Sequence, residues 1–204
     1  MKKERQYRAM TMTAPVAQTE EKPKLIETER YVEGYALTWD RYKLWGDEAD
    51  GTAVYEQFSR ENFNGCDMSD VIMQYNHEGR VYARLSNKSL ALEFDDGGLR
   101  IGADLGRTDG ARQLYDDIRA GMVTKMSWGF LPDYNSMHFD GKTRTITYGK
   151  IKKIFDVSAV SIPANDGTNI SARAYVDGEI DRIAQELRKR RIKKLMLRLR
   201  LSEM

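Results

Sequence analysis

Short runs of alternating apolar and polar residues, separated by turn residues, extend from Tyr31 to about Tyr175. Side chains on a strand alternate between the two faces of a sheet, so this period of two predicts half-buried β-strands. Strands this short and this close in sequence favour an antiparallel barrel or a sandwich. We therefore expect a mainly β protein with flanking helices (α+β), with about seven strands at 32–37, 71–75, 90–94, 99–103, 122–130, 143–148 and 153–160.

Two local signals mark a hairpin and a helix. The run Asp95-Asp96-Gly97-Gly98 separates two of the expected strands, and its glycines can adopt the positive φ that a tight turn requires. Apolar residues then recur at helical spacing between a capping Thr108 and Gly121, which predicts an amphipathic helix. A shorter helix is expected from Tyr55 to Phe63.

The chain of 204 residues is long enough for one domain and about fifty residues of tail. Residues 1–28 lack apolar periodicity and predict a flexible N-terminal arm, and residues 29–176 form the expected domain. Residues 177–204 predict a basic amphipathic helix. From Glu179 onward the chain has nine basic and four acidic side chains, which gives this segment a net charge of +5. The rest of the chain carries −3. Any polyanion would therefore meet the tail.

Composition excludes several classes of protein. The sequence has no apolar run of roughly 18 residues and no apolar signal core, so neither membrane insertion nor secretion is expected. One cysteine cannot form an internal disulfide, and two histidines are too few for a Cys/His zinc site. The pair Gly97-Gly98 precedes a strand and not a helix, so it is no nucleotide-binding motif. A reducing cytoplasm fits this composition.

Three residues could together hydrolyse a peptide bond. His77 follows an apolar strand, Ser127 lies inside one, and Asp156 interrupts an otherwise apolar run. Serine hydrolysis needs a hydroxyl nucleophile, an imidazole that takes its proton and a group that orients the imidazole. A buried carboxylate also needs a hydrogen-bond donor, which a histidine can supply. Each residue also has an ordinary structural interpretation, and these alternatives remain open on the residue types alone.

Five blocks of the chain, in this order, resemble the prohead maturation proteases of tailed bacteriophages. The resemblance covers about residues 31–175, and the blocks together are far more specific than any single one. The blocks are Val32-Glu33-Gly34-Tyr35-Ala36, Tyr75-Asn76-His77, Ser89-Leu90 with Asp96-Gly97-Gly98-Leu99, Gly121 to Phe130, and Phe155 to Asn165.

The resemblance implies a fold and a set of site residues. Members of this family are similar in fold to the herpesvirus assemblins, which implies an antiparallel β-barrel with surrounding helices. By position, the resemblance assigns His77 as general base and Ser127 as nucleophile. Asp156 takes the orienting role, at a position where the family more often has glutamate. Backbone N–H groups of Ala164 and Asn165 are the implied oxyanion donors.

The resemblance also implies a function. The expected activity is that of a serine endopeptidase that cleaves the scaffolding segment from the major capsid protein and digests itself. The expected location is the immature capsid, or prohead, in the host cytoplasm. Acyl transfer of this kind needs no cofactor and no metal. The expected partners are the major capsid protein and a further copy of the chain, as substrate or in a homodimer or higher oligomer. No membrane is expected as a partner, and nucleic acid is disfavoured.

Several alternatives compete with this interpretation. The chain could be a noncatalytic scaffold or capsid-binding assembly protein that uses its basic C-terminal helix. A basic-tailed nucleic-acid binder is disfavoured by the acidic body. Cys66 could be a nucleophile, but no neighbouring cation lowers its pKa. His138 with Asp133 and Asp140 could suggest a metal site, although the residues between them look like a solvated loop.

Overall fold

The computed structural model describes residues 6–11 as backbone with the side chain of Gln6, residues 22–161 in full, and nine positions between 182 and 193. Apart from the helical positions between 182 and 193, this part of the chain contains twelve strands, one α-helix and two 3₁₀ turns. The elements are β1 (Gln6–Thr11), β2 (Tyr31–Thr38), β3 (Tyr42–Trp45), β4 (Val54–Glu56), η1 (Arg60–Phe63), β5 (Ile72–Tyr75), β6 (Glu78–Arg84), β7 (Leu90–Phe94), β8 (Gly98–Asp104), α1 (Asp109–Arg119), β9 (Lys125–Pro132), η2 (Tyr134–Ser136), β10 (Met137–Asp140), β11 (Thr145–Tyr148) and β12 (Ile151–Val160).

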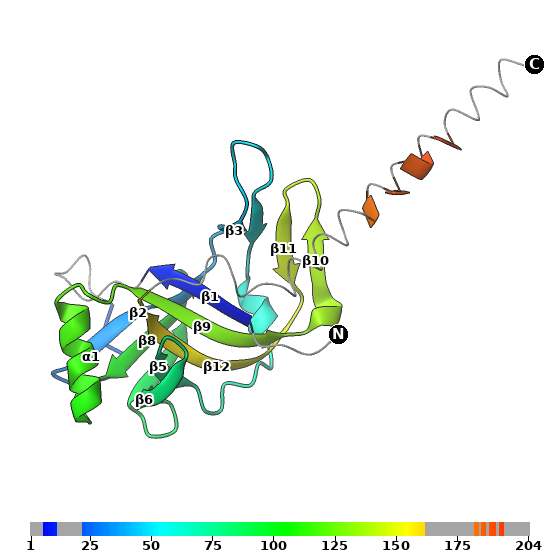
Figure 1. The fold of residues 1–204 in the computed structure, drawn as a ribbon. Coiled ribbons are helices and arrows are strands. Elements are labelled where there is room, and N and C mark those ends of the chain that lie inside the picture. The colour runs from blue at the N-terminus through cyan, green and yellow to red at the C-terminus, as the bar shows by residue number, and fades with distance from the viewer. Residues whose placement is uncertain are drawn as a thin grey trace, which may run out of the picture.

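The strands pair into three open sheets. The largest has the order β1-β9-β12-β5-β6, the second β10-β11-β4-β3 and the third β2-β8-β7. Figure 1 shows β1, β9 and β12 side by side, with α1 toward one end of this layer and the β10–β11 hairpin toward the other. The mainly β prediction is confirmed. No closed barrel is found among the described residues, because each sheet ends in two edge strands, and two pairings, β12 with β5 and β11 with β4, are parallel.

Three of the local predictions are confirmed, and one is wrong. The β7–β8 hairpin turns through Asp95, whose carboxylate accepts hydrogen bonds from the N–H groups of Gly97 and Gly98. The helix α1 begins after Thr108, which caps the N–H of Ala111, and buries one apolar side. All seven expected strands are present, six with shifted ends and 90–94 with the expected ends, but the total of about seven is too low, because β1, β3, β4, β6 and β10 were not expected. The helix expected at 55–63 is instead β4, a loop and η1.

The core lies against one face of β9. Met126, Trp128 and Phe130 are fully buried at alternating positions of this strand. The rings of Trp128 and Phe130 stack with centroids 4.1 Å apart, and Phe58 packs edge-on against both. The indole N–H of Trp128 has no hydrogen-bond partner among the described residues, so packing alone holds this ring. Because side chains alternate along a strand, Ser127 and Gly129 lie on the opposite face.

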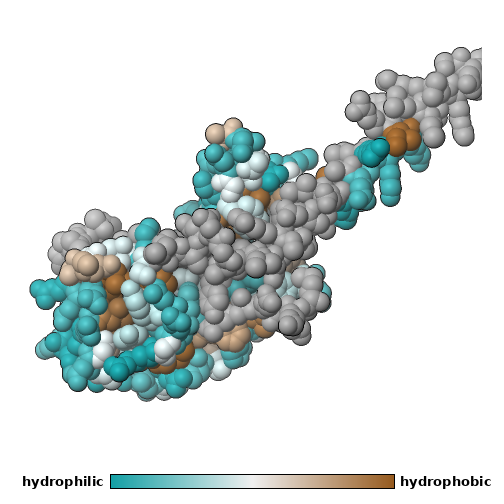
Figure 2. Space-filling model, in the orientation of Figure 1, coloured by the Kyte–Doolittle hydropathy of each residue, from teal (hydrophilic) through white to brown (hydrophobic). Residues whose placement is uncertain are grey.

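The surface of this fold is mainly polar. Figure 2 shows hydrophilic colour over most of the described residues on the face in view, with hydrophobic colour in limited patches. The helix α1 follows the same rule, since Ala111, Leu114 and Ile118 are its buried residues. No helix among the described residues is long and apolar enough to span a membrane.

Part of the expected N-terminal arm belongs to the fold. Residues 6–11 form β1, which pairs antiparallel with β9 so that Ala9 lies opposite Ser127. The expectation of an unpacked arm is therefore wrong for these residues. Backbone pairing with β9 orders this segment, which apolar periodicity does not reveal.

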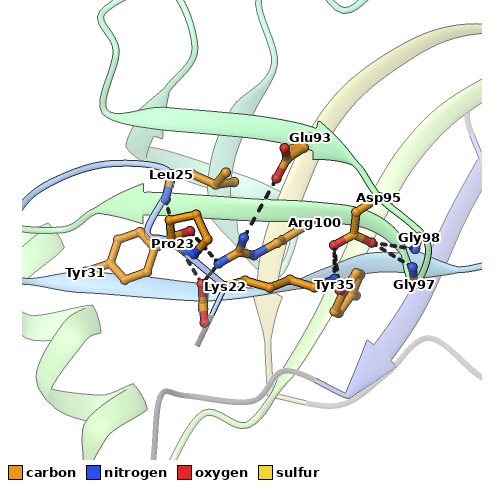
Figure 3. Close-up of polar contacts among 11 residues, drawn as sticks. Lys22, Pro23, Leu25, Tyr31, Tyr35, Glu93, Asp95, Gly97, Gly98 and Arg100 are labelled. Carbon is orange, nitrogen blue, oxygen red and sulfur yellow. Dashed lines mark hydrogen bonds and ion pairs between the residues drawn. The ribbon is translucent and has the colours of Figure 1, made fainter. Parts of the chain in front are cut away.

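A second contact holds residues 22–25, here called the strap, against β2 and β8 (Figure 3). The buried guanidinium of Arg100 donates to the carbonyl oxygen of Pro23 at 3.0 Å and to the carboxylate of Glu33 at 2.6 Å. Lys22 donates to Asp95 at 2.6 Å. Two charge-assisted hydrogen bonds therefore hold the strap, one from Arg100 to Pro23 and one from Lys22 to Asp95.

The described positions of the basic tail, between 182 and 193, are helical and mostly exposed. Arg182 and Glu186 form an ion pair at 2.7 Å, one helical turn apart. The remainder of the predicted tail lies outside the described residues, so its boundaries at 177–204 stay a prediction.

The Asp95 contact predicts a pH dependence of stability. Burial disfavours the charged carboxylate, but hydrogen bonds from Lys22, Tyr35 and Gly97 outweigh this effect and lower the pKa of Asp95 to about 2. Because the folded pKa is below the unfolded value of about 4, the stabilisation is present above pH 4 and is lost as the pH falls toward 2. Solvent screening at the half-exposed Lys22 limits the effect to about 1 kcal/mol.

Urea unfolding of wild type and of Asp95→Asn between pH 6 and pH 2 measures this contribution. We expect the variant to be less stable at pH 6 and the difference to shrink below pH 4. Asp96→Asn changes the exposed neighbouring carboxylate and is the matched control. A constant difference between wild type and Asp95→Asn across this range would contradict the prediction.

Candidate active site

Ser127 lies on β9, an interior strand of the largest sheet. It is opposite Ser158 of β12, and Gly129 is opposite Asp156 on the same pair of strands. Since residues two apart on a strand share a face, Ser127, Asp156 and Ser158 all lie on the face of the sheet that is turned away from the aromatic core. All three residues are fully buried. Gly129, opposite Asp156, has no side chain on this face.

His77 lies in the turn between β5 and β6. Tyr75 pairs with Glu78, so the turn has two residues, Asn76 and His77, with φ of 53° and 63°. Two successive positive φ angles are the pattern of a type I′ hairpin turn, in which asparagine is common at the first position and glycine at the second. His77 therefore occupies a place where a side chain is conformationally costly.

The turn is fixed to the end of β12. The N–H of Asn76 donates to the carbonyl oxygen of Ala159 at 2.9 Å, and the side-chain oxygen of Asn76 accepts from the N–H of Ser161 at 3.0 Å. The strands β5 and β12 are parallel, and Tyr75 and Ala159 are their last paired residues. The contacts of Asn76 therefore extend this pairing into the turn. They place the imidazole directly above the strand that contains Asp156.

The three side chains form one chain of hydrogen bonds. The Nε2 atom of His77 is 2.6 Å from the Oγ of Ser127, and its Nδ1 atom is 2.5 Å from the Oδ1 of Asp156. A carboxylate only accepts hydrogen bonds, so in the neutral imidazole Nδ1 carries the proton and Nε2 accepts from the hydroxyl of Ser127. The His77 side chain is 13% exposed and the Asp156 side chain is not exposed at all.

Sequence reasoning missed one member of this cluster, Ser158. Its hydroxyl donates to the Oδ1 of Asp156 at 2.5 Å, the same oxygen that accepts from His77. The signal in the sequence is the spacing of two between Asp156 and Ser158 within a predicted strand, which puts both side chains on one face.

The other candidates lie apart from this cluster or outside the described residues. Burial, followed by the charge of Asp67, raises the pKa of the Cys66 thiol to about 11, which leaves very little thiolate at neutral pH.

The described part of the chain has no group of three or more side chains that could hold a metal ion, and this includes His138 with Asp133 and Asp140. Ala164 and Asn165 lie outside the described residues, so their role as oxyanion donors stays a prediction.

The geometry permits a particular kind of chemistry. A hydroxyl that donates to a neutral imidazole can lose its proton as its oxygen attacks a carbonyl carbon, and a carboxylate on the far nitrogen stabilises the resulting imidazolium. The hydroxyl and the imidazole are within hydrogen-bond distance of each other. The arrangement is therefore suited to acyl transfer.

Comparison with known proteins shows that the model of one protein family matches most of this chain. A model described as caudovirus prohead serine protease matches residues 17–186, a span that includes β2 to β12 and all three members of the hydrogen-bond chain. Searches of curated proteins and of solved structures returned no match.

The turn geometry predicts how substitutions of Asn76 affect stability. Both Asn76→Ala and Asn76→Gly lose the hydrogen bond from Ser161, but only alanine also meets the steric cost of a positive φ. We expect Asn76→Ala to lower the free energy of unfolding by about 1 kcal/mol more than Asn76→Gly does. Urea denaturation of the two variants measures this difference. Equal losses would show that the backbone at this position is not strained.

Proposed function

Because the chain belongs to the caudovirus prohead serine protease family, we propose that it is an endopeptidase that cleaves the scaffolding segment from the major capsid protein. We place its activity inside the immature capsid in the host cytoplasm and include the enzyme itself among its substrates. The observation that supports the proposal is the continuous hydrogen-bond chain from Ser127 through His77 to Asp156. The proposed reaction uses no cofactor.

In the proposed mechanism, Ser127 Oγ attacks the carbonyl carbon of the scissile peptide bond, and its proton passes to His77 Nε2. Asp156 stabilises the imidazolium through the bond to Nδ1. The tetrahedral intermediate collapses as the imidazolium protonates the leaving amine, which leaves an acyl ester on Ser127. A water molecule then attacks this ester as its proton passes to His77. The second tetrahedral intermediate collapses as the imidazolium returns that proton to Ser127 Oγ, which releases the acid. Backbone N–H groups of Ala164 and Asn165 are the proposed donors to the oxyanion.

A second candidate function is a noncatalytic assembly protein. The positions 188–190 of the basic tail are helical and exposed, which suits association with an acidic partner surface. This candidate predicts that the residues of the hydrogen-bond chain matter only for stability. Coexpression of the chain with the capsid protein of the same phage, followed by mass spectrometry of both, distinguishes the two functions and identifies the cleavage sites.

The first prediction of the proposed function concerns the nucleophile. Ser127→Ala removes one hydroxyl and little volume, so the fold should persist while cleavage of the capsid protein falls by at least about 10³-fold. Ser69→Ala, which removes an exposed hydroxyl bonded to Asp67, is the matched control and should cleave normally. Wild-type processing by purified Ser127→Ala would exclude Ser127 as the nucleophile.

The second prediction concerns the orienting carboxylate. Asp156→Asn preserves the shape of the side chain but offers an amide in place of an acceptor-only group, which holds the imidazole in the wrong tautomer. We expect a loss on the order of 10⁴ in kcat for a peptide containing the cleavage site. Asp140→Asn, at the end of β10, is the control. Undiminished kcat in Asp156→Asn would reduce Asp156 to a structural residue.

A further inference from the structure

We infer that Ser158 is a fourth, positioning member of the site, which holds the carboxylate of Asp156 in the rotamer that faces His77. Its hydroxyl lies 2.5 Å from Asp156 Oδ1 and acts through this carboxylate. This inference rests on the proposed function for its kinetic consequences but not for its structural ones.

Burial determines the direction of this hydrogen bond. Ser158 and Asp156 are both fully buried, and a buried hydroxyl beside a carboxylate must donate, since the carboxylate has no proton to give. The single hydroxyl proton of Ser158 therefore points at Asp156. This orientation also distinguishes Ser158 from a second nucleophile, because His77 Nε2 is bonded to Ser127.

The strand register makes the contact a property of the fold. Ser158 follows Asp156 by two residues on β12 and lies directly opposite Ser127 on β9. The nucleophile, the orienting carboxylate and its donor therefore share one face of one strand pair. Cross-strand neighbours of this kind have Cβ atoms roughly 5 Å apart, so the side chains of Ser127 and Ser158 lie next to each other on this face.

The second donor counters a specific freedom of the aspartate. The terminal torsion of an aspartate is broad, so a carboxylate held by one donor can rotate away from it. Ser158 and His77 both bond to Oδ1, and their bonds point to the same oxygen from two different elements, β12 and the β5–β6 turn. Rotation of the carboxylate would break both bonds at once, which holds Oδ1 toward the imidazole.

The test compares Ser158→Ala with Ser158→Thr, which keeps the hydroxyl. Ser89→Ala is the matched control, because Ser89 is equally buried and its hydroxyl bonds to the backbone of Arg84 and to Asn87. A hydrogen bond to a charged group contributes enough for its loss to lower kcat roughly 10- to 100-fold. We expect this loss in Ser158→Ala with an unchanged KM, and we expect most of the rate to return in Ser158→Thr. Equal kcat in wild type and Ser158→Ala, or equal losses in the alanine and threonine variants, would overturn the inference.

A second readout is independent of catalysis. The proton between His77 Nδ1 and Asp156 should give a far-downfield NMR resonance in wild type and in Ser89→Ala. In Ser158→Ala this resonance should shift upfield or broaden through exchange, and in Ser158→Thr it should return. An unchanged resonance in Ser158→Ala would overturn the inference. If wild type cleaves no peptide but the resonance responds in this way, the positioning role holds and the proposed function fails.

Discussion

The position of β12 between β9 and β5 is the constraint on which the site depends. It pairs antiparallel with β9 on one side and parallel with β5 on the other. These two pairings bring together residues that lie 50 and 79 positions apart in the chain. The aromatic core on the inner face of β9 fixes which residues face the other way, since a slip of one residue would turn Ser127 into the core. Packing on one face therefore determines which hydrogen-bonding side chains lie on the other.

The turn that carries His77 shows how a conformationally costly residue is tolerated. A positive φ at histidine is unfavourable by roughly 1 kcal/mol or more. Two hydrogen bonds between Asn76 and the end of β12 offset this cost and leave the imidazole with little freedom to move. Because the site is built from strands and one short turn, its geometry has the rigidity of the sheet.

Local signals were sufficient for some of these elements and not for others. The cap and periodicity of α1 and the glycine turn of the β7–β8 hairpin depend on neighbouring residues only, so both follow from the sequence. The strand β6 begins with exposed polar residues and has no apolar alternation, and β1 gains its order from pairing with β9, so neither has a local signature. The role of Ser158 follows only from register: a serine in an apolar run has many explanations until the residue opposite it is known.

The order of the strands along the chain also has a consequence for when the site exists. During synthesis His77 and Ser127 emerge well before Asp156, and β5 has no pairing with β9 that would bring these two residues together. Contacts this distant in sequence form late in folding, because the intervening chain must first be ordered. A nascent or partly folded chain therefore contains both the hydroxyl and the imidazole but no strand to join them. Among the described residues β12 is the last strand along the chain, so the three side chains can be joined only once β12 has been added between β9 and β5.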